Sequence, residues 1–449
     1  MTPRRTRGAI PAGLTPDFLV IAALATHLLL VFTLRVLAWP DVTIPAYLWS
    51  RGMLLYRDIK FQHGPGVMGT LALAFWAFGV HTWVVRLYAI VWPLVAHIFV
   101  LRYTRSFGLA ERAFASAFFL AVFFSFEGNS NWPTAVMAVA ALPIAANLSR
   151  GRIVRAGLLI GTAILFKQTA AYVVVAAFFG LAIERKFRSA ALVVLVSCIP
   201  YWVTVLVFAL LGAGSEMIRW TLEVPLTIRP SFISSWPSVF DASVLLFAFL
   251  PTFTDTLLER PGDYEVRSGW LLFVAAGFAA VVYPRFGLPQ TLAAVPCLAV
   301  GAARFLRRLS ARPLLRTAAY GLVAMFTFGR AAILVAGGEF DGKVLFWDHE
   351  PALDALAVRL RALPRGTPLH STLWDNVLPR SGLLPPGHLY VNPYFTWFFG
   401  VDDIGNRFEA AFRRTGGVLV EYRGAASGPD VIGPYRIVRV EPQGTGTAE

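Results

Sequence analysis

The sequence predicts an all-α polytopic membrane protein with a small C-terminal α/β domain, and three observations lead to this class. Hydrophobic residues make up 57% of the 449 residues and charged residues only 15%, whereas about a quarter of the residues in a soluble domain are charged. Apolar stretches near the length of a membrane span recur up to residue 336. After that point, short β-like runs alternate with proline and glycine.

We expect residues 1–336 to form a transmembrane domain of about eleven spans plus one juxtamembrane helix. The expected spans are 17–37, 83–101, 112–126, 133–148, 153–166, 169–184, 188–211, 240–258, 268–283, 286–303 and 315–336. The apolar stretch 66–80 is too short to cross, because a helix rises by about 1.5 Å per residue. It is therefore predicted to be a juxtamembrane or re-entrant helix of the first outer loop, 38–82.

The basic residues give these spans one consistent orientation. The chain begins with Arg4, Arg5 and Arg7, and if these are cytoplasmic, the basic connections fall on the same side: 102–111, 149–155, 184–188, 259–267 and 304–316. The net charge of +14 then reflects topology and contacts with lipid headgroups, so membrane lipids are expected partners and nucleic acid is not. The alternate connections then lie on the outer side of the membrane.

Residues 337–449 are predicted to form the small α/β domain, on the extracytoplasmic side, because an odd number of spans precedes them. Helix-like apolar periodicity runs through 350–363, and β-like runs occur at 369–373, 417–422 and 435–440.

The first outer loop concentrates titratable groups beside the membrane. Asp41 follows the first span closely, and it is either the N-cap of the next helix or a proton acceptor. Asp58 either pairs with Arg57 or Lys60 or supplies a catalytic acid. His63, in His-Gly-Pro-Gly, is either a ligand or a polar side chain of a tight turn.

Further polar residues are expected at the outer ends of later spans. Glu127 begins the turn after the third span, Lys167 and Gln168 lie in Phe-Lys-Gln-Thr, and Arg285 lies in Tyr-Pro-Arg-Phe. Snorkelling toward lipid headgroups explains any one of these cations, but together they suit a phosphate. Walker A, dinucleotide, zinc-peptidase and serine-hydrolase motifs are absent from the sequence, so those activities have no support.

These motifs together resemble the N-terminal module of the GT-C glycosyltransferases, over about residues 15–310. The resemblance rests on Asp41, Tyr56-Arg-Asp58, His63-Gly-Pro-Gly66, Phe166-Lys-Gln-Thr169 and Tyr283-Pro-Arg-Phe286. Within that superfamily the chain is most similar to bacterial relatives of protein O-mannosyltransferases, aminoarabinose transferases and lipopolysaccharide-core galacturonosyltransferases.

The resemblance implies an inverting glycosyltransferase that moves a sugar from a polyprenyl-phosphate donor to an acceptor hydroxyl on a glycolipid, a cell-wall glycan or a protein. It implies that Asp41 is the general base and Glu127 the second outer acid, with Asp58 a further candidate. The residues expected at the donor phosphate are His63, Lys167, Arg285, Arg57 and Gln168.

Two departures from the family pattern affect this assignment. His63 stands where many relatives have a lysine, and Val42 follows Asp41 where relatives often have a second acid. The resemblance therefore leaves open whether a divalent metal ion takes part. The chemistry needs one carboxylate to accept a proton and cations to hold the leaving phosphate, which departs without an acid catalyst.

Two other classes stay open on the sequence. One is a transporter or flippase of lipid-linked sugars, although transporters usually bind near the bilayer midplane. The other is an O-antigen ligase or polymerase, for which the loop 212–239 is the one candidate. The polar residues gathered at one face favour the transferase.

Overall fold

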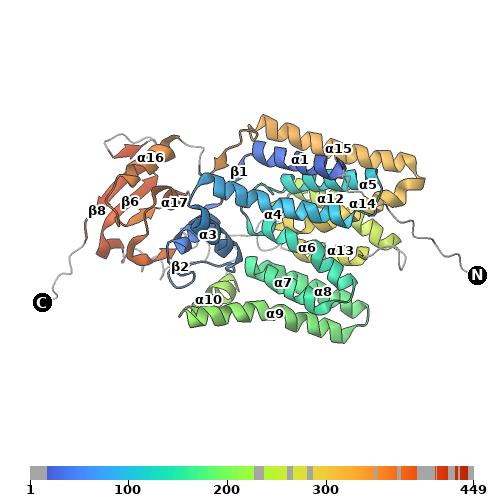
Figure 1. Ribbon diagram of the computed structural model, residues 1–449, viewed down its shortest axis with the longest axis horizontal. Helices are drawn as coiled ribbons and strands as arrows, with labels where there is room; N and C mark the ends of the chain where they lie inside the picture. The colour runs from blue at the N-terminus through green and yellow to red at the C-terminus, as the bar shows by residue number, and fades with distance from the viewer. Residues whose placement is uncertain are drawn as a thin grey trace, which may run out of the picture.

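The computed structural model describes residues 18–226, 237–259, 266–280, 287–347, 351–371, 376–391, 410, 412–422, 430–432 and 435–442. A body of packed helices forms most of it, and a smaller part of strands and short helices lies at one end (Figure 1). Segments of the first outer loop, α3 (Gly66–Phe78), β1 (Val36–Leu37) and β2 (Ile59–Lys60), lie between these two parts.

Each of the predicted spans overlaps a helix of the body, with two differences. These helices are α1 (Phe18–Thr33), α4 (Thr82–Tyr103), α5 (Leu109–Ser125), α6 (Pro133–Ser149), α7 (Ile153–Phe166), α8 (Ala171–Ile183), α9 (Phe187–Leu210), α12 (Val239–Leu258), α13 (Ser268–Ala279), α14 (Val295–Arg308) and α15 (Pro313–Ala336). The span predicted at 17–37 ends early, because α1 stops at Thr33 and Val36–Leu37 form β1, and the span predicted at 286–303 begins as the 3-10 helix η4 (Leu288–Ala294) before α14. Among the described helices, α4, α9, α12 and α15 are long and apolar enough to cross a membrane. The predicted helical class is confirmed, and the exact number of spans stays a prediction.

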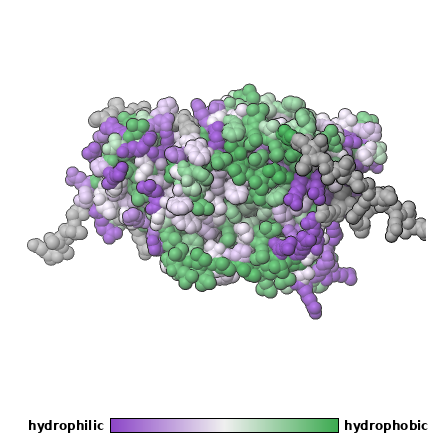
Figure 2. Space-filling view, viewed as in Figure 1, coloured by the Kyte–Doolittle hydropathy of each residue, from purple (hydrophilic) through white to green (hydrophobic). Residues whose placement is uncertain are grey.

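The surface of the helical body is apolar. Large side chains such as Leu210, Phe240, Leu314 and Phe328 are exposed on it. Apolar residues occupy the middle of the molecule in Figure 2, and hydrophilic residues gather toward its two ends. An apolar surface of this extent is unfavourable in water and matches the hydrocarbon core of a bilayer, so the protein is a membrane-embedded, multi-pass protein.

A separate helix, α3, forms where the juxtamembrane helix was predicted. It packs against α2 (Pro40–Ser50), and Val67, Leu71 and Phe75 are buried there. Its start is fixed by close contact with the end of α7, because a Cβ on Gly64 would overlap the carbonyl oxygen of Leu165. The glycines of His-Gly-Pro-Gly thus let the first outer loop pack tightly against α7.

The C-terminal part contains a four-stranded sheet in the order β4-β6-β8-β7. Its strands are β4 (Leu369–Ser371), β6 (Gly417–Tyr422), β7 (Val431–Ile432) and β8 (Tyr435–Val440). β4 and β6 are parallel, and β8 is antiparallel to both β6 and β7. The helices are α16 (Pro351–Arg361) and α17 (Val377–Ser381). The strand and helix positions agree with the periodicity of the sequence.

The C-terminal part is joined to the first outer loop through parallel strand pairs. β1 pairs with β3 (Val344–Leu345), and β2 pairs with β5 (Tyr390–Val391). The buried Asn376 donates hydrogen bonds from its side-chain nitrogen to the carbonyl oxygens of Ala38, at 2.9 Å, and Phe346, at 3.0 Å. One hydrophobic core contains residues from both parts. The strand pairs before and after Asp41 in the chain, β1–β3 and β2–β5, therefore hold its segment against the C-terminal part.

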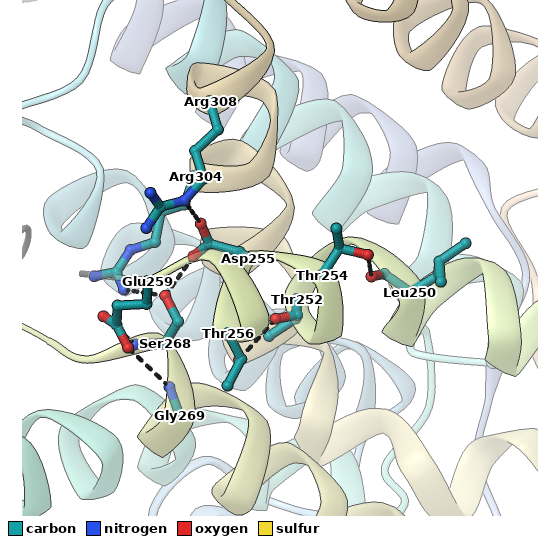
Figure 3. Close-up of polar contacts among 10 residues, drawn as sticks. All are labelled: Leu250, Thr252, Thr254, Asp255, Thr256, Glu259, Ser268, Gly269, Arg304 and Arg308. Atoms are coloured by element: carbon teal, nitrogen blue, oxygen red, sulfur yellow. Dashed lines mark hydrogen bonds and ion pairs between the residues drawn. The ribbon is translucent and has the colours of Figure 1, made fainter.

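A buried ionic network joins the C-terminal ends of α12 and α14 to the N-terminal end of α13 (Figure 3). The fully buried carboxylate of Asp255 pairs with Arg308 and accepts a hydrogen bond from the Ser268 hydroxyl. Arg304 donates to that same hydroxyl at 3.1 Å, and Glu259 accepts from the backbone nitrogen of Ser268 at 2.8 Å. The network connects three helices near the basic connections that the sequence predicts to be cytoplasmic.

We expect Asp255→Asn to destabilise the protein by about 3–5 kcal/mol, because removing one charge from a buried pair leaves the other poorly compensated. The matched control is Asp430→Asn, which breaks the exposed pair with Arg359 and should cost at most about 1 kcal/mol. Thermal melting in detergent measures both effects. Equal melting temperatures for the two variants would contradict the structural role of the network.

Candidate active site

Asp41 lies in the first turn of α2, directly after Trp39 and Pro40. Trp39 occupies the N-cap position without a side-chain cap hydrogen bond, so Asp41 is not the N-cap residue. A carboxylate in the first turn is still favoured by the helix dipole. Burial raises the pKa of Tyr390, and the charge of Asp41 raises it further, which indicates that the Asp41 carboxylate lies near the Tyr390 phenol.

Asn131 connects α2 to the start of α6. Its side-chain oxygen accepts a hydrogen bond from the backbone nitrogen of Trp39 at 2.9 Å, and its side-chain nitrogen donates to the Thr43 hydroxyl at 2.9 Å. These two bonds are made on either side of Asp41 along the chain. The sequence analysis missed Asn131, although it stands only four residues after Glu127 in the same turn.

His63 is buried against the end of α7 and faces Gln168. The side-chain nitrogen of Gln168 donates to the Gln62 carbonyl at 2.6 Å, so its side-chain oxygen is the atom 3.2 Å from His63 Nδ1. That nitrogen must therefore carry the proton, and Nε2 is left as an acceptor. Burial and the neighbouring Lys167 ammonium lower the pKa of His63 to about 3, against the opposing effect of the Gln168 bond. His63 is consequently neutral at pH 7.

Lys167 stands at the break between α7 and η1 (Gln168–Ala170), with only 4% of its surface exposed. Its ammonium donates to the side-chain oxygen of Gln290. It also lies 5.1 Å from the ring centre of Trp132, within range of a cation–π interaction. Gln290 belongs to η4 (Leu288–Ala294), whose Pro289 carbonyl accepts a hydrogen bond from Thr134.

The structure thus brings three of the predicted residues together with two that the sequence analysis missed. We call this group the Lys167 cluster, and its members are His63, Trp132, Lys167, Gln168 and Gln290. Trp132 links the cluster to the Asp41 segment, because its ring packs against Trp39 at 5.6 Å between centres. Trp132 directly follows Asn131, so one short turn holds both halves of the site.

The predicted acid Asp58 uses its carboxylate within its own turn. One oxygen accepts from Arg57 at 2.9 Å, and the other accepts from Arg57 and from the backbone nitrogen of Leu54. Burial raises the pKa of Asp58, but the bonds to Arg57 and Leu54 outweigh that effect and hold it below its usual value. The Arg57 side chain is half-exposed. Neither residue is part of the Lys167 cluster.

Glu127 faces a different set of groups. It lines a cavity of about 140 Å³ with Arg35, Arg330 and Glu339. Burial raises the pKa of Glu127, the Arg330 charge opposes this, and Glu339 adds to it. A role for Glu127 in catalysis stays a prediction.

Arg285, the remaining predicted phosphate ligand, lies outside the described residues. Among the residues that the structure does describe, no group of three or more histidine, cysteine, aspartate or glutamate side chains could hold a metal ion. We therefore derive no step through a metal ion.

Comparisons with known proteins give a family match for part of the chain and a similar fold for most of it. A family model for dolichyl-phosphate-mannose-protein mannosyltransferases matches residues 62–212. The fold is similar to that of ArnT from Cupriavidus metallidurans bound to undecaprenyl phosphate, with a TM-score of 0.63 and 15% identity over 95% of this chain and 99% of that chain. The apo state of ArnT gives a TM-score of 0.58 and 14% identity over 95% and 98%. A search of curated proteins finds no match.

The chain therefore shares the fold of ArnT, and about a third of it matches the mannosyltransferase family model. The family model covers the whole turn 127–132, together with His63, Lys167 and Gln168. It begins after Asp41, so the Asp41 segment lies outside the family match.

Proposed function

We propose that this protein is a glycosyltransferase that moves a sugar from a polyprenyl-phosphate donor to an acceptor hydroxyl, with inversion at the anomeric carbon. The observation that carries the proposal is that one turn, Asn131–Trp132, contacts both the backbone segment around Asp41 and the buried cation of Lys167. A base on one side of a sugar and a phosphate-binding cation on the other are the groups that such a displacement needs.

In the proposed reaction the acceptor oxygen forms a bond to the anomeric carbon while the bond from that carbon to the phosphate oxygen breaks. Asp41 takes the proton of the acceptor hydroxyl, and the electron pair of the broken bond goes to the phosphate. Lys167 balances the charge that develops there. A single displacement from the opposite face inverts the configuration. His63 holds Gln168 as a neutral group and adds no charge at pH 7.

An apolar pocket beside the cluster supports a lipid-linked donor. It has a volume of about 470 Å³ and is lined by residues of α12 and α15, including Phe247, Leu322 and Phe326. Its lining includes Leu288, two residues before Gln290, which holds Lys167. The charged residues in the lining are Glu127 and Arg330, and Leu288 connects the pocket to the η4 segment that contacts Lys167. The undecaprenyl phosphate bound to the structurally similar ArnT is consistent with such a donor.

We further propose that the site faces outward from the cytoplasmic membrane. The basic connections 102–111 and 304–316 are predicted to be cytoplasmic. The cluster is built from the first outer loop, the end of α7 and the start of α6, which the same orientation assigns to the opposite end of these spans. The C-terminal part, joined to that loop, then lies outside too.

The experiment is mass spectrometry of envelope glycolipids, cell-wall glycans and glycoproteins from cells with and without this protein. We expect loss of one sugar from one class of molecule, and its recovery with wild-type protein but not with Asp41→Asn. That result identifies the sugar and the acceptor together. Recovery of the same modification by Asp41→Asn at equal expression would contradict the proposed mechanism, and an unchanged set of glycoconjugates would contradict the proposed function.

A further inference from the structure

Trp132 occupies a central place between the two halves of the site. The Lys167 ammonium lies 5.1 Å from its ring centre, and the His63 ring packs edge-on at 6.3 Å. On the Asp41 segment, Trp39 packs against it at 5.6 Å. Any movement of this ring would alter the position of the ammonium, so the geometry of the site depends on the position of Trp132.

Three buried polar atoms in and beside the cluster have no hydrogen-bond partner among the described residues. They are Trp132 Nε1, Gln62 Oε1 and Thr169 Oγ1. Buried polar groups are nearly always paired, because leaving one unpaired costs about 1–3 kcal/mol. The three atoms belong to segments that contact one another through Gln168 and His63, so a polar ligand at the cluster would supply partners that the protein itself does not.

The chemistry of the indole nitrogen restricts what that ligand presents to it. An indole N–H is a donor only, so its partner must be an acceptor atom. The adjacent Lys167 ammonium favours an acceptor that carries negative charge. A phosphoryl group offers several such oxygens, and two of them can accept from the indole and the ammonium at once.

We propose that Trp132 is a donor-binding residue whose indole N–H donates a hydrogen bond to an oxygen of the donor phosphate, while its ring holds Lys167 in place. This inference rests on the proposed function and adds a second phosphate ligand to it. Trp132 is half-buried in the structure, so the ligand reaches the indole edge through a small movement of the ring.

The test is binding of undecaprenyl phosphate to the full-length protein in detergent, with undecaprenol as the probe that lacks the phosphate. Trp132→Phe keeps an aromatic ring and removes the N–H, so we expect about ten- to a hundredfold weaker binding of undecaprenyl phosphate, the range for a hydrogen bond to a charged group. Binding of undecaprenol should stay within about twofold, since the prenyl chain does not contact the indole nitrogen. Trp132→Leu should weaken phosphate binding further, because Lys167 then also loses its contact with the aromatic ring.

The matched control is Trp92→Phe, which removes another buried indole nitrogen, on α4. It should leave the affinity for undecaprenyl phosphate unchanged. If Trp132→Phe behaves like this control while Lys167→Met loses affinity, the inference is overturned and the proposed function stands. If the wild-type protein does not prefer undecaprenyl phosphate to undecaprenol, the proposed function itself fails.

A second measurement applies if Trp132→Phe does not fold. Wild-type protein labelled with ¹⁵N-tryptophan should show one indole N–H signal that moves downfield when undecaprenyl phosphate is added. The same signal should not move in Lys167→Met protein. Indole signals that stay unchanged in the wild-type protein at saturating lipid would overturn the inference.

Discussion

Replacing Asp41 with asparagine is expected to reduce the rate of sugar transfer by about two to four orders of magnitude, because the amide cannot accept the proton of the acceptor hydroxyl. Binding of undecaprenyl phosphate should change little, since Lys167 and not Asp41 holds the phosphate. The measurement is transfer of a labelled sugar from polyprenyl phosphate by purified protein, at matched melting temperature.

The control for this prediction is Asp354→Asn, which removes an exposed carboxylate of α16 that pairs with Arg380. It should leave the transfer rate unchanged. Equal turnover by wild-type and Asp41→Asn protein would remove Asp41 from catalysis. Attention would then move to Glu127, because both carboxylate oxygens of Asp58 already accept hydrogen bonds within its turn.

Replacing Lys167 with methionine is expected to weaken the use of the donor by about 10²- to 10³-fold, the cost of removing one group that stabilises a developing anion. The apolar chain of methionine fills the same space, so the helix break between α7 and η1 should be retained. Affinity for undecaprenyl phosphate and kcat/KM for the donor measure the effect.

The matched control is Lys60→Met, from the first outer loop. The Lys60 ammonium is engaged with Glu216 at 2.9 Å and with the carbonyl oxygen of Tyr56. Its loss should affect stability more than phosphate binding. If the two lysine variants bind undecaprenyl phosphate equally well, Lys167 does not hold the donor phosphate.

The local patterns of the sequence predicted the long helices of the body and three of the strands, β4, β6 and β8. The apolar stretches from 17–37 to 315–336 each overlap a helix, because a span must satisfy its own backbone hydrogen bonds and must be apolar over its whole length. The runs at 417–422 and 435–440 form β6 and β8, because alternation of side chains suits a sheet with one buried face. Both signals are contained within a few neighbouring residues.

Part of the candidate site could be predicted in the same way. His63, Lys167 and Gln168 lie in short motifs next to expected span ends, and the structure brings all three together. In the turn after the third span, the sequence indicated Glu127 alone as a candidate site residue. The residues of that turn that join the site are Asn131 and Trp132, whose neutral side chains gave no electrostatic signal.

The sequence by itself determined the membrane class, the helical elements and the residue types available for phosphate chemistry, because hydropathy and motif spacing are local properties. Only the tertiary structure decided which of these residues meet. The pairing of β1 with β3 and of β2 with β5 joins segments some 300 residues apart. The turn chemistry of Asp58, the direction of Glu127 toward Arg330 and the neutral state of His63 likewise depend on neighbours from other segments. Contacts of that kind follow from how the helices pack together, which the residues of any one segment do not record.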